Sequence, residues 1–147
     1  MLMKPTYIFY VFILFICFSI SIKSSAQAVS GFLTIENYYK VKWGYAEEFI
    51  HLWKVNHYPL LKKAMENKDI VSVEARNPIL HGGEDTRWDF RVIIVFRDAK
   101  AAFDQKLLDP YKKLLYPDSE KLKKEEEHRF SLLLAHWDVI SEPVILP

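Results

Sequence analysis

Hydrophobic and polar positions along the chain follow two different periods, and the change of period separates expected strands from expected helices. Where apolar residues recur at every second position, the pattern is typical of a strand with one buried face. Where they recur at three- and four-residue spacing, it is typical of an amphipathic helix. Strands are predicted over 31–43, 70–77, 88–96 and 132–140. Helices are predicted over 45–66 and 98–107, and further helical segments begin at Asp109–Pro110 and Pro117–Asp118.

The predicted order is strand, helix, strand, strand, helical segment, strand. This is the order of a split βαβ arrangement, in which one antiparallel sheet carries the helices on one face. We therefore predict an α+β, ferredoxin-like βαββαβ fold with a four-stranded antiparallel sheet. Residues 27–147 are expected to form it as a single domain, because their number leaves little room for a second core.

Single residues mark the expected ends and bends of these elements. Gly44 is expected to end the first strand, and Asp98 is the expected N-cap of the second helix. Pro59 removes one backbone N–H from the long first helix and should kink it near Val55. His57 lies at this kink, and we interpret it as a surface or core-edge residue that could hydrogen-bond a freed carbonyl.

Strand alternation sorts the side chains of the sheet into two faces. One set is almost entirely apolar and is expected to pack under the helices: Leu33, Ile35, Asn37, Tyr39, Val41; Val71, Val73, Ala75; Trp88, Phe90, Val92, Ile94, Phe96; Leu133, Ala135, Trp137, Val139. The other set is mostly polar and charged: Thr34, Glu36, Tyr38, Lys40; Ser72, Glu74, Arg76; Asp89, Arg91, Ile93, Val95; Leu134, His136, Asp138.

The polar set has two interpretations. It is either a solvated face, which is normal for an antiparallel sheet, or a face covered by the same sheet of a second copy. Ile93, Val95, Leu132 and Leu134 favour coverage, since a freely exposed face rarely carries four such side chains. The sequence therefore predicts a homodimer through this face.

Composition removes several classes of function. The 147 residues contain 20 Lys and Arg against 19 Asp and Glu, so the chain lacks the basic excess of a nucleic-acid binder. A single Cys excludes a disulfide framework and a multi-cysteine metal site. The charged run over 121–129 mixes both signs, which is typical of a solvated helix face.

The first 26 residues have the pattern of a signal peptide. Lys4 precedes an uncharged run of 15 residues, Ile8 to Ile22, which is shorter than the roughly 20 residues that span a bilayer. Ser24 and Ala26 suit signal peptidase, so cleavage is expected after Ala26. The chain is then exported, periplasmic or secreted, with no membrane span after cleavage. The alternative is an uncleaved N-terminal anchor.

The strand–glycine–long helix opening at 41–63, VKWGYAEEFIHLWKVNHYPLLKK, is followed by two strands, a helix and a last strand. In this the chain resembles the dimeric α/β-barrel superfamily over roughly 31–139. Within it the chain looks like the NIPSNAP and EthD-like proteins, and more distantly the antibiotic-biosynthesis-monooxygenase-like proteins. The resemblance implies two sheets that face one another, with small organic ligands, sometimes haem, between sheet and helices.

Haem-degrading members of this superfamily use an Asn on the first strand, a Trp on the third and a His on the second helix. Asn37 and Trp88 match the first two, but 98–107 contains no histidine, so the resemblance does not extend to haem degradation. Asn37 and Trp88 are more simply core-face residues. His81 with Glu84 and Asp85 has a metal-like composition on a glycine-rich loop without fixed geometry. No cofactor and no metal site is predicted.

The remaining candidate chemistry lies on the polar face. His136 on the last strand is expected across the sheet from Glu36, as a catalytic base oriented by a carboxylate. For ligand binding, Arg76 and Arg91 are expected to hold an anionic ligand or oxygen, and Tyr38 is expected to donate a hydrogen bond. The alternative is a set of cross-strand ion pairs, such as Glu74 with Arg91.

Together these features predict an exported small-molecule-binding protein of the dimeric α/β-barrel type. It is either a cofactor-free enzyme that acts on a small organic compound or a non-catalytic binding or assembly protein. The expected partners are a small organic molecule and a second copy of the chain, and no nucleic acid.

Overall fold

The computed structural model describes residues 31–80 and 82–141. Its elements in chain order are β1 (Leu33–Val41), α2 (Ala46–Leu52), the π-helical turn η1 (Trp53–His57), α3 (Tyr58–Glu66), β2 (Ile70–Arg76), β3 (Phe90–Phe96), α4 (Ala99–Phe103), α5 (Asp109–Leu115), α6 (Ser119–Ser131) and β4 (Leu133–Ser141). The predicted leader, with its alternative as an anchor, lies outside the described residues.

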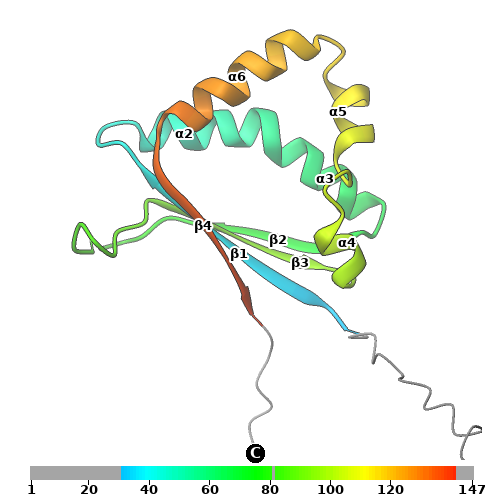
Figure 1. Cartoon of the computed structure of the whole chain (residues 1–147), viewed down its shortest axis with the longest axis horizontal. Helices are drawn as coiled ribbons and strands as arrows, with labels where there is room; N and C mark the ends of the chain where they lie inside the picture. Colours follow the sequence, from blue (N-terminus) through cyan, green and yellow to red (C-terminus); the bar gives the residue numbers. More distant parts are fainter. Residues whose placement is uncertain (1–30, 81, 142–147) are drawn as a thin grey trace, which may run out of the picture.

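The four strands form one sheet in the order β2-β3-β1-β4, and every neighbouring pair is antiparallel. All helices lie on one side of this sheet (Figure 1). The α+β ferredoxin-like fold with a four-stranded antiparallel sheet is therefore confirmed. The long helical connection α2–η1–α3 packs directly across the sheet. Helix α6 lies above α2, on the side away from the sheet (Figure 1).

The core fills the space between the sheet and α2–η1–α3. Phe90, at the start of β3, packs against the rings of Tyr39, Phe49 and Trp53. The centre of its ring lies 5.2 to 6.2 Å from the centres of these three rings. Phe90 is 2 % exposed. Burying such large apolar and aromatic surfaces is the main favourable contribution to folding.

Most element ends agree with the pattern, and local chemistry explains them. Gly44 adopts φ of 84°, a conformation that glycine reaches without strain, in the turn between β1 and α2. The Asp98 carboxylate accepts a hydrogen bond from the Ala101 amide at 2.7 Å and caps α4, as predicted. This helix ends at Phe103 rather than at 107.

The third strand begins later than predicted. It starts at Phe90, because the chain bends at Asp89, whose carboxylate is held by the Val41 amide and by Arg87. Trp88 lies before this bend, and its ring meets the edge of the Tyr38 ring at 6.0 Å. Trp88 and Phe90 therefore lie on opposite faces of the sheet, and the prediction that both are core residues was wrong for Trp88.

One extra residue in β4 reverses the predicted faces of that strand. Val41 pairs with Leu133, so these two share the helix-side face as predicted, but Lys40 pairs with Ala135, so Leu134 is inserted as a bulge. Beyond the bulge Trp137 is opposite Tyr38 and His136 is opposite Tyr39. The predicted core positions of Ala135, Trp137 and Val139 were therefore wrong. A similar irregularity between Ile70 and Ser72 leaves Val71, predicted as core, 49 % exposed.

The sheet face opposite the helices is called the open face below. Residues that are paired in register share a face, so its members follow from the pairing: Thr34, Glu36, Tyr38 and Lys40; Ser72, Glu74 and Arg76; Arg91, Ile93 and Val95; Ala135, Trp137, Val139 and Ser141.

Candidate functional site

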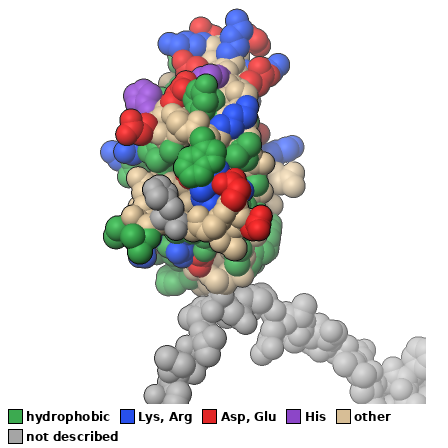
Figure 2. All heavy atoms as spheres, turned by 90° about the vertical axis from the view of Figure 1, so that its left-hand side faces the viewer, with side chains coloured by type: hydrophobic (Ala, Val, Ile, Leu, Met, Phe, Trp, Pro, Cys, Tyr) green, Lys and Arg blue, Asp and Glu red, His purple; other side chains and the backbone are tan. Residues whose placement is uncertain are grey.

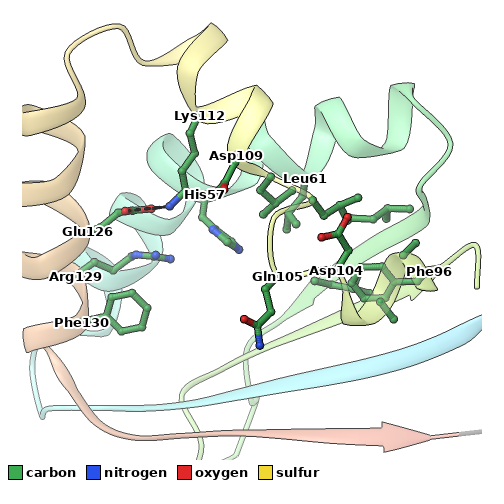
Figure 3. Close-up of a pocket in the computed structure, with 16 residues that line it drawn as sticks. His57, Leu61, Phe96, Asp104, Gln105, Asp109, Lys112, Glu126, Arg129 and Phe130 are labelled. Carbon is green, nitrogen blue, oxygen red and sulfur yellow. Dashed lines mark hydrogen bonds and ion pairs between the residues drawn. The ribbon is translucent and has the colours of Figure 1, made fainter. Parts of the chain in front are cut away.

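A cavity of about 340 Å³ lies between the helices and the sheet. Its apolar wall comes from Leu61 on α3, Ile70 on β2, and Ile94 and Phe96 on β3. Charged and polar side chains reach it from α5, α6 and the end of η1, and Figure 3 shows them on the side away from Phe96. Its size is within the range of pockets that hold small organic molecules. Nine of its 16 lining residues are apolar, and the other seven are polar or charged.

A distortion of the first helix brings His57 to this cavity. Pro59 lacks the N–H that would bond to the Val55 carbonyl in a regular helix, and the turn Trp53–His57 is π-helical. The Tyr116 hydroxyl donates a hydrogen bond to the Val55 carbonyl at 2.6 Å. The predicted distortion near Val55 is thus present, but the freed carbonyl is satisfied by Tyr116 and not by His57.

His57 is neutral at physiological pH. Burial, with smaller contributions from the nearby cations Arg129 and Lys112, lowers its pKa from 6.5 to about 3. Its Nδ1 atom is buried and has no hydrogen-bond partner within the described residues. The ring points into the cavity (Figure 3). His57 therefore offers a neutral hydrogen-bonding group to whatever occupies the cavity.

Arg129 on α6 is the second polar group that enters the cavity. Its side chain is 4 % exposed, and its Nε atom has no hydrogen-bond partner among the described residues. Its guanidinium lies 5.0 Å from the centre of the Phe130 ring. Burial lowers the pKa of Arg129 from its ordinary value. The prediction of a solvated face over 121–129 fits the mixed charges on the outside of α6, at the top of Figure 2, but was wrong for Arg129.

Neither His57 nor Arg129 was predicted as a site residue. The sequence does carry one signal for Arg129: Leu122 and Arg129 are seven residues apart on α6, and both are buried. Two helical turns separate them, so they share the face that points to the protein interior. For His57 the signal is Pro59, which distorts the helix next to it.

The predicted catalytic pair of His136 and Glu36 is not formed. His136 is opposite Tyr39 on the helix-side face, where the two rings stack at 4.4 Å, and its Nε2 atom lies 3.2 Å from the Asp138 carboxylate. Glu36 is opposite Val139 on the open face. The bulge at Leu134 separates them, because it moves His136 to the other side of the sheet.

Three of the predicted residues do come together on the open face. The Glu36 carboxylate accepts a hydrogen bond from the Tyr38 hydroxyl at 2.7 Å and pairs with Arg91 at 2.5 Å. The Tyr38 hydrogen bond is the largest cause that lowers the pKa of Glu36, and Arg91 lowers it further. Trp137 stacks on Tyr38 at 5.4 Å. A role of Tyr38 and Arg91 in ligand binding stays a prediction.

Arg76 lies apart from this cluster. Its Nε atom pairs with Glu74 at 2.6 Å, and both side chains are more than half exposed. Arg76 and Arg91 both line a shallow hollow beside Trp88 at the edge of the sheet. The expected pair of Glu74 with Arg91 is replaced by Glu74 with Arg76 and Glu36 with Arg91.

The pair that resembles haem-degrading proteins is also separated. Asn37 lies on the helix-side face and donates through Nδ2 to the Val92 carbonyl at 3.2 Å, whereas Trp88 lies against Tyr38 on the open face. His81 lies outside the described residues. Within 31–80 and 82–141 no group of three or more His, Cys, Asp or Glu side chains could hold a metal ion. No helix in these ranges has the length and apolar character needed to cross a membrane.

Comparison with known proteins identifies the fold and no family. No family model matches the chain, and no curated protein matches its sequence. Among solved structures, a dimeric ferredoxin-like protein from an uncultured marine organism is 9 % identical, with a TM-score of 0.53 over 80 % of this chain and 94 % of that one.

Two other structures are similar at lower TM-scores. SnoaB, a cofactor-independent oxygenase from Streptomyces nogalater, is 12 % identical, with a TM-score of 0.47 over 78 % of this chain and 95 % of that one. A dimeric protein of unknown function with a ferredoxin-like fold, from Bacteroides fragilis, is 12 % identical, with a TM-score of 0.46 over 76 % and 96 %. At these identities the likeness concerns the fold alone.

Proposed function

We propose that this chain is a small-molecule-binding protein whose ligand occupies the cavity between the helices and the sheet. The observation that carries the proposal is the pair of buried nitrogen atoms, His57 Nδ1 and Arg129 Nε, that lack partners beside a cavity of about 340 Å³. Native proteins rarely leave buried polar groups unsatisfied. A bound ligand would supply the missing hydrogen bonds and bury its apolar part against Ile94 and Phe96.

The geometry favours binding over catalysis. A cofactor-free enzyme needs a general base whose pKa lies near the operating pH. The histidine that lines the cavity has a pKa of about 3 and is a weak base. The other candidate base, His136, stacks on Tyr39 and faces Asp138 instead of the expected Glu36. We therefore favour the non-catalytic alternative.

The binding test uses 2-naphthalenemethanol, a neutral aromatic alcohol that is small enough for the cavity. Ala102 on α4 lines the cavity, and Ala99 on the same helix does not. Ala102→Phe should fill the cavity and weaken binding at least tenfold, whereas the matched variant Ala99→Phe should leave the dissociation constant within about twofold. Chemical-shift titration of the labelled protein measures both. Equal affinity of the alcohol for wild type and for Ala102→Phe would show that it does not bind in the cavity.

The proposed assembly is a homodimer through the open face. Ile93, Val95, Trp137 and Val139 all lie on this face, and Trp137 and Val139 are 39 % and 42 % exposed. Because of the bulge in β4, the apolar side chains that this strand contributes to the open face are Trp137 and Val139, and not Leu132 and Leu134 as predicted. A second sheet would cover them and would enclose the ion pair of Glu36 with Arg91.

The proposed location is outside the cytoplasm. The support is the sequence of residues 1–26, in which an uncharged run of 15 residues is followed by Ser-Ser-Ala. Intact-mass measurement of the exported protein should give a chain that begins at Gln27. A chain that still carries Met1 or Leu2 would instead support the N-terminal anchor.

A further inference from the structure

The two most deeply buried arginines of the described residues differ in whether the protein supplies partners for their guanidinium groups. Arg87 is 3 % exposed, and its guanidinium donates to the Val41 carbonyl at 3.2 Å and to the Asp89 carboxylate at 2.6 Å, with Glu84 as a further partner. These contacts fix the loop before β3 to the end of β1. Arg129 is 4 % exposed, yet no hydrogen bond or ion pair holds its side chain within the described residues.

A buried guanidinium without an anionic partner is costly, because it has lost its water and gained no charge-assisted hydrogen bond. The carboxylate that is closest along α6, Glu126, is already engaged by Lys112 at 3.0 Å. Figure 3 shows this pair beside Arg129, while the Arg129 side chain extends toward His57 and the cavity. Among the described residues, Arg129 is therefore the one cationic side chain that enters the cavity without an ion-pair partner.

The other acidic residues of the cavity do not neutralise Arg129. Asp104 and Asp109 line its outer part, and both are exposed to solvent. Asp104 accepts a hydrogen bond from the Lys106 amide at 2.9 Å, within its own loop. The Asp104 carboxylate lies across the cavity from Arg129 in Figure 3. The interior of the cavity thus combines one guanidinium without an ion-pair partner among the described residues, a neutral histidine and an apolar wall.

We propose that the ligand is a small organic acid whose carboxylate pairs with Arg129 and accepts a hydrogen bond from His57, while its apolar body packs against Ile94 and Phe96. This inference rests on the proposed function, since it names the class of molecule that the same cavity binds. A planar carboxylate matches the fork of guanidinium donors, and such paired, charge-assisted hydrogen bonds are strong where water is excluded. A neutral ligand of the same shape would leave Arg129 unpaired.

The test compares two molecules that share one apolar body, 2-naphthoate and 2-naphthalenemethanol. Wild type should bind the carboxylate at least tenfold more tightly than the alcohol, as measured by chemical-shift titration or calorimetry. Arg129→Met, which keeps the volume and removes the charge, should abolish this preference and leave the affinity for the alcohol within about twofold. Lys123→Met removes an exposed charge from the same helix and should preserve the preference. Raising the salt concentration should weaken the preference little, because the pair is buried.

The outcomes separate the two proposals. Binding of both molecules to wild type with equal affinity would overturn the organic-acid inference and keep the cavity as a binding site. Binding of neither would overturn the proposed function itself. If Arg129→Met does not fold, Arg129→Lys serves instead: it keeps the charge without the planar fork and should retain only part of the preference. Because the comparison in wild type needs no variant, the inference is tested in either case.

Discussion

His57 shows at the scale of one residue how the fold changes the chemistry of a side chain. The unfolded chain binds a proton at this histidine with the ordinary pKa of 6.5, and the folded chain does so at about 3. Between these values the unfolded state binds more protons than the folded state. The stabilising contribution of neutral His57 is therefore complete above pH 6.5 and is lost as the pH falls toward 3.

From this shift we expect the free energy of unfolding to decrease below pH 6.5 by up to about 1.4 kcal/mol per pH unit from His57 alone. Urea unfolding at about pH 7 and about pH 5 measures it. His57→Gln should remove roughly 2 kcal/mol of the difference between these two conditions, whereas His51→Gln, an exposed position on α2, should not change it. A wild-type pH dependence in the His57 variant would contradict the neutral state of His57 in the folded protein.

Phe90 gives a second prediction at the residue scale. It contacts the rings of Tyr39, Phe49 and Trp53 and is 2 % exposed. Phe90→Ala should lower the free energy of unfolding by about 3–5 kcal/mol, since it removes a large side chain and leaves a cavity. Phe103→Ala, at a position that is 60 % exposed, should change it by less than about 0.5 kcal/mol. A loss below about 1 kcal/mol at Phe90 would contradict its place in the core.

At the scale of the element, the π-helical turn is stabilised from another part of the chain. Pro59 leaves the Val55 carbonyl without its usual helical donor, and the Tyr116 hydroxyl at the end of α5 supplies the hydrogen bond at 2.6 Å. This contact ties α5 to the long first helix. The same segment carries Lys112, so the turn and one wall of the cavity are connected.

A double-mutant cycle tests this connection. Tyr116→Phe should cost about 1 kcal/mol, the usual contribution of one hydrogen bond. In a Pro59→Ala background the same change should cost less than about 0.5 kcal/mol, because the new N–H at position 59 can donate to the Val55 carbonyl. Chemical denaturation of the four proteins gives the coupling. Equal costs in both backgrounds would show that Tyr116 does not replace the missing donor.

The strands show how far the sequence alone can go. The alternation of Phe90, Val92, Ile94 and Phe96 predicts the buried face of β3 correctly, because a regular strand has a period of two. In β4 the residues before Ala135 are Leu132, Leu133 and Leu134, which fit either face equally well. The pattern therefore carries no sign of the extra residue, and one bulge reverses the faces of Trp137 and His136.

The candidate site was missed for a related reason. Periodicity identifies residues that must be buried because they are apolar, and it assigns charged residues to solvent. Arg129 is buried because it shares a face with Leu122, and the half-buried His57 reaches the cavity because Pro59 distorts the helix beside it. Each follows from the geometry of its element and not from its own chemical type. The predicted polar cluster is present only where its members lie on regular stretches of strand, as Glu36, Tyr38 and Arg91 do.

At the scale of the whole molecule, the sheet has one covered face and one face that no described residue covers. The helices bury one side (Figure 1). On the open face the stacked rings of Tyr38 and Trp137 lie beside Trp88, with the paired charges of Glu36 and Arg91 among them. Aromatic side chains with an embedded arginine are the composition that protein interfaces favour.

Ile93 provides the most direct test of the proposed homodimer. It is paired with Glu36 on one side and Glu74 on the other, near the middle of the open face. In a monomer, Ile93→Lys would place an ammonium group between two carboxylates, so the fold should persist and the helical circular dichroism should not change. In a dimer the same charge would be desolvated at the interface, which is costly.

Light scattering at micromolar concentration should therefore give about twice the chain mass for the unmutated protein and a shift toward the single chain for Ile93→Lys. Leu114→Lys, at a position on α5 that is 68 % exposed, should remain dimeric. A monomer in the unmutated protein would leave Trp137 and Val139 exposed and would contradict the proposed assembly. The cavity around Arg129 lies on the other side of the sheet, so this outcome would not affect the proposed binding site.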